Sequence, residues 1–101
     1  MGGLNNLILW QENTEPLYRQ ELSIRANQAR KMLKGTYDPQ LAPKIWMYLA
    51  DATSKSYKKE FGSGFDIATR RAAAKFWAAH FEKEARDGGA SFLKDIIAAA
   101  K

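Results

Sequence analysis

The chain has 101 residues, of which 46% are apolar and 27% charged, and this balance with a net charge of +5 excludes a disordered polyelectrolyte. The absence of cysteine excludes disulfide bonds, thiolate metal sites and cysteine nucleophiles. No apolar run approaches the roughly 20 residues of a membrane span, and the first ten residues lack the basic start and long apolar stretch of a secretory signal. We therefore expect one cytoplasmic domain over residues 1–101 that contacts no membrane.

The first predicted helix covers residues 14–34. The Asn-Thr pair at 13–14 supplies an N-cap, and Gly35 is the usual residue after a helix end. Residues 1–12 are predicted to be an apolar N-terminal arm, either a short strand or a segment lying over the other helices. The apolar stripe of the first helix, at helical spacing, comprises Tyr18, Leu22, Ala26, Ala29, Met32 and Leu33.

The second predicted helix covers residues 43–61, after a turn at 38–41. A helix that began at Asp38 would place Pro43 where a backbone hydrogen bond is needed, so we expect the helix to begin at the proline. It ends at the glycine-rich segment 62–64. Its expected buried stripe comprises Ile45, Trp46, Leu49, Thr53 and Tyr57.

The third predicted helix covers residues 66–87, and a short tail helix covers residues 91–101. Asp66 and Ser91 are suitable N-caps, and two glycines at 88–89 separate the elements. The tail helix is short enough to need packing for stability. The apolar stripe of the third helix comprises Ile67, Ala74, Trp77, Ala78, Phe81 and Ala85.

These elements predict an all-α fold: a small antiparallel helical bundle of three long helices plus a short C-terminal helix and an apolar N-terminal arm. The loop at 62–65 is short, so the second and third helices should be neighbours. The expected core contains Trp46, Leu49, Trp77 and Phe81.

Catalytic motifs are missing from the sequence. His80 and Glu84 share a helix face, but a zinc site needs three or four ligands, and with a single histidine we expect no metal. There is no GxSxG nucleophile motif, and the segment 62–64 lacks the spacing and lysine of a phosphate-binding loop. We expect no enzyme activity, no cofactor and no small-molecule substrate.

Positive charge is concentrated in the middle of the chain, where residues 25–75 carry eleven basic and four acidic residues. On the second helix, one exposed sector is predicted to hold Lys44, Tyr48, Lys55, Lys58 and Lys59, with Asp51 among them. A lysine row with an interleaved tyrosine is what a phosphate-binding face requires. Such a row is equally typical of an ordinary solvated helix face.

Charges on the third helix oppose its dipole. Arg70, Arg71 and Lys75 lie in its first turns, whereas Glu82, Glu84 and Asp87 lie in its last turns. This arrangement indicates either a binding surface or ion pairs with a neighbouring helix, for which Glu60 is a candidate.

Two arginines, Arg25 and Arg70, fall on predicted buried stripes. Arg25 lies between Tyr18 and Met32 on the wheel, and Arg70 lies beside Trp77 and Phe81. A buried arginine needs a carboxylate or an aromatic face. We favour ion pairs at the edge of the core, with Asp51 or Glu60 as partners, over a binding role. Leu17 and Ile24 lie off the stripe of the first helix and are candidates for a second contact surface.

Five short segments within roughly residues 14–82 consist mostly of caps, turns and core aromatics. They are Thr14-Glu15-Pro16-Leu17-Tyr18-Arg19, Ala29-Arg30-Lys31, Gly35-Thr36-Tyr37-Asp38, Leu41-Ala42-Pro43-Lys44-Ile45-Trp46 and Tyr57-Lys58-Lys59-Glu60-Phe61-Gly62. Together they resemble a small uncharacterised protein family of bacteriophage and mobile-element genomes, and the resemblance implies a fold more than an activity. Small accessory phage proteins are often non-enzymatic binders of host machinery, including anti-CRISPR-like inhibitors of defence complexes.

We therefore expect a non-catalytic accessory protein, encoded by a phage or mobile element, that binds a host protein or nucleoprotein complex in the host cytoplasm. Inhibition of host defence is one role that the resemblance implies. The alternative is low-specificity DNA or RNA binding through the lysine row of the second helix and the basic start of the third. A charge of +5 is modest for a dedicated DNA-binding protein.

Overall fold

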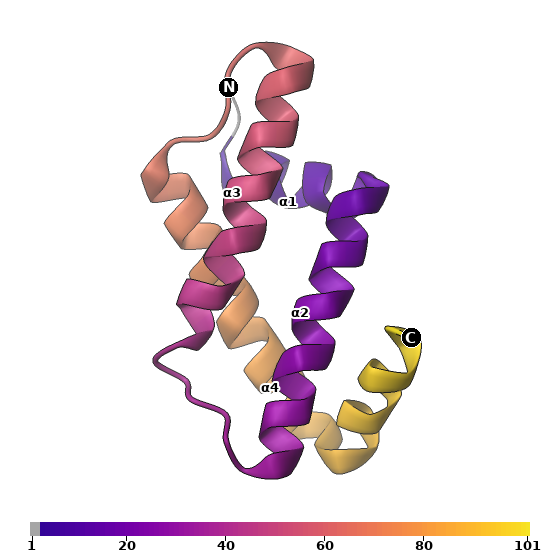
Figure 1. Cartoon of the computed structure of the whole chain (residues 1–101). Coiled ribbons are helices and arrows are strands. Elements are labelled where there is room, and N and C mark those ends of the chain that lie inside the picture. The colour runs from indigo at the N-terminus through magenta and orange to yellow at the C-terminus, as the bar shows by residue number, and fades with distance from the viewer. Residues whose placement is uncertain (1–2) are drawn as a thin grey trace.

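The computed structural model describes residues 3–101, and this part of the chain forms helices and no strand. The elements are α1 (Leu4–Asn13), α2 (Glu15–Lys34), α3 (Ala42–Phe61) and α4 (Ile67–Ala99). In Figure 1 the helices α2, α3 and α4 form the body of a bundle, and α1 lies across one end of it. Helix α1 contacts all three of the others. The all-α prediction is confirmed.

The ends of α2 and α3 and the start of α4 lie close to the helix-capping and helix-ending residues identified in the sequence. Gly35 and Gly62 adopt left-handed conformations, with φ of 76° and 88°, directly after α2 and α3. Thr14 is extended and is the non-helical joint between α1 and α2. Asp66 is the N-cap of α4, because its side chain accepts a hydrogen bond of 2.8 Å from the backbone N–H of Thr69. This hydrogen bond lowers the pKa of Asp66.

The N-terminal segment corrects the prediction of an arm or strand over residues 1–12, because residues 4–13 are helical. The side chains of Leu7 and Gln11 are buried, and Leu4 and Ile8 are partly buried at the same helical spacing. Ten residues are too few for a stable isolated helix, so contacts with the other helices must stabilise α1. Residues 1 and 2, which the predicted arm included, lie outside the described residues.

The predicted separation of two helices at residues 88–90 appears as a kink within α4, where the backbone is non-helical at Gly89. Residues 67–99 form one element, and its kink lies at Gly89, where φ is 64° and ψ is −158°. Figure 1 shows the yellow tail turning back toward α2 after this kink. Leu93 in the tail is buried in the main core. Packing against the core therefore holds the tail in place after the kink.

The predicted core is confirmed, since Trp46, Leu49, Trp77 and Phe81 are all buried. The rings of Trp46 and Trp77 are stacked, with centroids 5.7 Å apart, and join α3 to α4. The indole N–H of Trp46 donates a hydrogen bond of 3.0 Å to the side-chain oxygen of Gln28 in α2. One aromatic pair thus connects the three long helices.

The buried face of α2 differs from the predicted stripe. Leu17, expected on a second contact surface, is only 6% exposed and belongs to the core, against which Ile24 is partly buried. Tyr18 and Leu33, expected in the stripe, are exposed. The buried face is rotated relative to the predicted stripe because it includes three polar residues, of which only Arg25 was expected to be buried. They are Glu21, Arg25 and Gln28.

Arg25 is buried, as predicted, but its partner is neither Asp51 nor Glu60. Its guanidinium donates a hydrogen bond of 3.1 Å to Glu84 of α4. The same group lies 5.2 Å from the ring centroid of Phe81 and 5.9 Å from that of Phe92, and the second ring belongs to the tail. Arg25 therefore ties α2 to both parts of α4 through a carboxylate and two aromatic faces.

Glu21, one turn before Arg25, is a buried carboxylate in the same helix. Its Oε1 accepts a hydrogen bond of 3.1 Å from the amide of Gln11 in α1. Burial raises the pKa of Glu21 above its ordinary value of 4.5, although the hydrogen bond with Gln11 and the charge of Arg25 act in the opposite direction.

Replacing Trp77 with alanine should destabilise the fold strongly. The substitution removes a buried side chain and its stack on Trp46. Such large-to-small changes at aromatic positions lower the free energy of unfolding by about 3–5 kcal/mol. Chemical denaturation measures the change, with the exposed Tyr48→Ala as the control that should stay close to wild type. Unchanged unfolding of Trp77→Ala would contradict the packing described above.

Replacing Glu21 with glutamine should make stability less dependent on pH. Because the folded-state pKa of Glu21 is raised, the folded chain binds this proton more tightly than the unfolded chain does. The wild type should therefore lose stability as the pH rises from 4.5 through the folded pKa, and Glu21→Gln should avoid that loss while keeping an acceptor for Gln11. Urea denaturation between pH 4 and pH 8 gives both curves. A variant less stable than wild type at pH 7 would mean that attraction to Arg25 outweighs the burial of the carboxylate.

Candidate binding site

The lysine row predicted on the second helix lies on the exposed side of α3. Tyr48 is 71% exposed, and the lysine side chains around it are exposed as well. The row follows one side of the helix and comprises Lys44, Tyr48, Lys55, Lys58 and Lys59. Its exposure is as predicted, but exposure alone does not distinguish a binding face from a solvated one.

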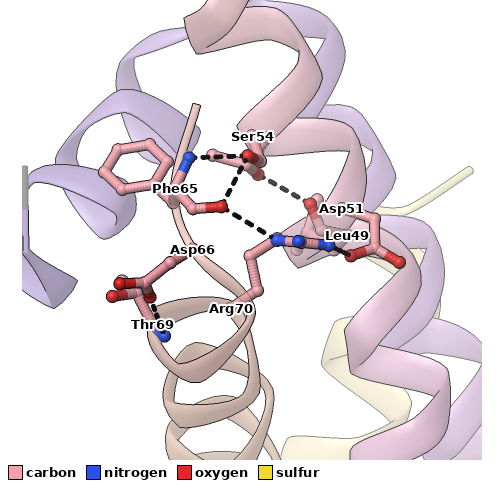
Figure 2. A network of polar contacts seen from close by, with 8 residues as sticks. Leu49, Asp51, Ser54, Phe65, Asp66, Thr69 and Arg70 are labelled. Atoms are coloured by element: carbon pink, nitrogen blue, oxygen red, sulfur yellow. Dashed lines mark hydrogen bonds and ion pairs between the residues drawn. The ribbon is translucent and has the colours of Figure 1, made fainter. Parts of the chain in front are cut away.

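The connection from α3 to α4 is held by a network of polar contacts (Figure 2). The hydroxyl of Ser54 accepts a hydrogen bond of 2.8 Å from the N–H of Phe65 and donates one of 3.3 Å to its carbonyl oxygen. The Nε of Arg70 donates to the same carbonyl at 3.0 Å, and its Nη1 donates to Asp51 at 2.8 Å. These contacts fix where the start of α4 lies along α3.

Gly64 is required where this loop passes Ser54. A Cβ at Gly64 would lie 2.5 Å from the Ser54 hydroxyl oxygen and 3.1 Å from the Ser54 carbonyl oxygen. Any side chain would therefore push the loop away from α3. The sequence indicated only that glycines end the helix here, whereas the structure gives Gly64 a second role in the close approach of the two helices.

Arg70 is thus a structural residue. The predicted pairing with Asp51 is confirmed, at 2.8 Å, but the predicted burial is not, because the Arg70 side chain is 28% exposed. Two of its nitrogens are engaged within the chain. These contacts explain why an arginine lies in the first turn of α4, so its placement is no longer evidence for a binding role.

Arg71 and Lys75 differ from Arg70, since both are exposed and neither forms an ion pair within residues 3–101. They lie with Lys44 of α3 along an open groove with a volume of about 410 Å³. The rest of its lining is apolar: Pro43, Met47, Ile67 and Ala74. We call these seven residues the basic groove. The structure therefore brings predicted binding residues from two helices into one site.

The other predicted binding residues lie outside the basic groove. Lys55 and Lys58 line a second hollow together with Asp51 and Arg70, whose ion pair offsets part of its charge. Lys59 and Tyr48 line neither hollow. Leu17 and Ile24 lie in the interior, so the prediction of a second contact surface there is wrong.

The apolar part of the basic groove was not predicted. Ile67 was expected in the core stripe, but it is 43% exposed at the first residue of α4. Pro43 and Met47 carried no sequence signal beyond helix formation. Only the position of α4 along α3 shows that the three side chains lie together.

The acidic end of α4 has partners within the chain. Glu84 binds Arg25 and lies 3.2 Å from His80, whose ring stacks on Phe76. Glu82 accepts a hydrogen bond of 2.6 Å from the hydroxyl of Tyr37, and burial raises the pKa of that tyrosine. Contacts with α2 and with the loop before α3 thus account for Glu84 and Glu82, but no such contact accounts for Arg71 and Lys75.

Residues 3–101 contain neither a metal-binding cluster nor a membrane-spanning helix. No group of three or more histidine, aspartate or glutamate side chains in this range could hold a metal ion. No helix in the same range combines the length and the apolar character that a membrane span needs.

Arg70 and Arg71, although adjacent, should respond differently to substitution. Arg70→Gln removes the ion pair to Asp51 and disturbs the contact with Phe65, so we expect a loss of about 1–2 kcal/mol in the free energy of unfolding. Arg71→Gln should stay within about 0.5 kcal/mol of wild type. Urea denaturation of the two matched variants gives the comparison. Equal losses would contradict the structural role of Arg70.

Comparison with protein-family models, with curated proteins and with solved structures finds no match for this chain. A function is therefore inferred from how the exposed residues are arranged. Among the described residues, the basic groove joins three exposed cations from two helices to an apolar surface.

Proposed function

We propose that this chain is a non-catalytic accessory protein that binds a host protein or nucleoprotein complex through the basic groove. The observation that carries the proposal is the meeting of Lys44, Arg71 and Lys75, from two helices, around an apolar floor. Protein interfaces commonly combine an apolar centre with a charged rim that selects the partner by complementary charge. The basic groove has both features at a small scale.

The unpartnered charges at the start of α4 support this proposal. Positive side chains in the first turns of a helix are disfavoured by its dipole. Arg70 offsets this by binding Asp51 and Phe65, but Arg71 and Lys75 have no such contact within residues 3–101. A negatively charged partner would supply the missing interaction.

The resemblance of residues 14–82 to a phage and mobile-element family supports a setting in the cytoplasm of a bacterial host. In that setting the partner belongs to the host, and inhibition of a host defence complex is one role that such binding would serve.

A second candidate function is direct binding of nucleic acid along α3. Tyr48, 71% exposed among lysines, would offer a surface for base stacking, and Lys44 to Lys58 would span about 21 Å at 1.5 Å per residue. This alternative uses the lysine row and leaves the apolar floor of the basic groove unoccupied.

A pull-down from a bacterial host lysate should separate these functions. We expect the wild-type protein to retain one defined host complex after nuclease treatment. The double change Arg71→Glu with Lys75→Glu should weaken this capture at least about tenfold, because it reverses two rim charges without removing a buried side chain.

The matched control is Arg30→Glu with Lys34→Glu, which makes the same change in net charge at exposed positions of α2. It should bind like wild type, and thermal melts should show that both doubles are folded. Equal weakening by both doubles would indicate an effect of net charge and contradict the proposed site. Loss of all capture on nuclease treatment, with tight binding to free oligonucleotides, would establish the second candidate instead.

A further inference from the structure

We infer that the basic groove receives an apolar side chain from an acidic, amphipathic segment of the partner protein. This inference rests on the proposed function, because it specifies the chemistry of the partner at the same site. It follows from the floor of the groove, from its rim, and from what each class of macromolecule can place there.

The floor of the basic groove consists of apolar side chains that the bundle does not fully bury. Ile67 is 43% exposed although it extends the apolar stripe of α4, and Met47 beside it is only partly buried. The groove volume of about 410 Å³ lies within the range of pockets that receive ligands or anchoring side chains. Covering this surface with an apolar group would remove it from water, which is favourable in proportion to the area buried.

The rim of the groove selects for negative charge. Lys44, Arg71 and Lys75 line it, and no acidic residue does. The guanidinium of Arg71 can bind a carboxylate through two parallel hydrogen bonds. An apolar residue flanked by aspartate or glutamate therefore satisfies floor and rim together, and an amphipathic helix with acidic neighbours is the simplest segment that presents this pattern.

Nucleic acid fits the rim but not the floor. A phosphate backbone would pair with the three cations, yet it has no aliphatic group to occupy the space between Met47 and Ile67. No aromatic side chain lines the groove, so an unstacked base would have only the guanidinium of Arg71 to stack on. The aliphatic floor therefore favours a protein segment.

The test uses a synthetic helical peptide with leucines along one face and glutamates elsewhere. Two further probes are the same peptide with every leucine replaced by serine, and an oligothymidylate of equal net charge. Fluorescence anisotropy measures binding of each, and methyl NMR of the full chain locates it. We expect the leucine peptide to bind most tightly and to shift the methyl signals of Met47 and Ile67. Equal binding of the serine peptide or of the oligothymidylate would overturn the inference.

The matched variants are Ile67→Ser in the groove and Leu33→Ser on α2, where the wild-type side chains are 43% and 42% exposed. We expect Ile67→Ser to weaken peptide binding about tenfold and Leu33→Ser to leave it unchanged. Ile67→Glu is a second groove variant, because an acidic residue suits the first turn of a helix and should fold while repelling the peptide. Peptide binding unaffected by both Ile67 variants would overturn the inference.

The two proposals fail in different ways. If Arg71→Glu with Lys75→Glu abolishes capture of the host complex while both Ile67 variants capture it fully, the proposed function stands and the apolar anchor is wrong. If neither charge reversal nor the Ile67 changes affect capture, the basic groove is not the binding site and both proposals are wrong.

Discussion

The start of α4 is fixed along α3 by a small polar network around Ser54, whose hydroxyl both accepts from and donates to the backbone of Phe65. This double contact replaces the partners that a loop residue outside a helix would otherwise need from water. Gly64 allows the approach, and Arg70 closes it by reaching Phe65 and Asp51 at once. A shift of one helical turn here would separate Lys44 from Arg71 and remove the groove between them.

Local signals were sufficient to predict most of the helical framework. Gly35 and Gly62 end helices in the left-handed conformation that glycine favours, and Asp66 caps the start of α4 with its side chain. The predicted inner faces of the helices were wrong where the buried side chains are polar. Gln11 is fully buried in α1, and Glu21 and Gln28 are buried in α2, yet a hydrophobic pattern assigns all three to the surface. Polar residues of this kind are recognised only when their partners in other helices are known.

The candidate site was predictable in parts and not as a whole. Lys44, Arg71 and Lys75 stood out through their charge and their place on each helix, and α3 and α4 were expected to be neighbours because the loop is short. The contacts between Ser54 and Phe65 determine which lysine of α3 lies next to which arginine of α4. Helical periodicity in the sequence does not predict these contacts. The aliphatic floor depends on the same contacts, which is why Ile67 was assigned to the core.

The ion pair of Arg25 and Glu84, enclosed between the rings of Phe81 and Phe92, has a consequence for how this protein responds to ionic strength. Dissolved ions screen exposed charges over about 8–10 Å at moderate concentrations but screen buried pairs much less. The Arg25 side chain is 10% exposed and the Glu84 side chain 33%, whereas Lys44, Arg71 and Lys75 are exposed. Added salt should therefore weaken the binding of the proposed acidic partner before it weakens this ion pair, so that binding and folding respond to the medium separately.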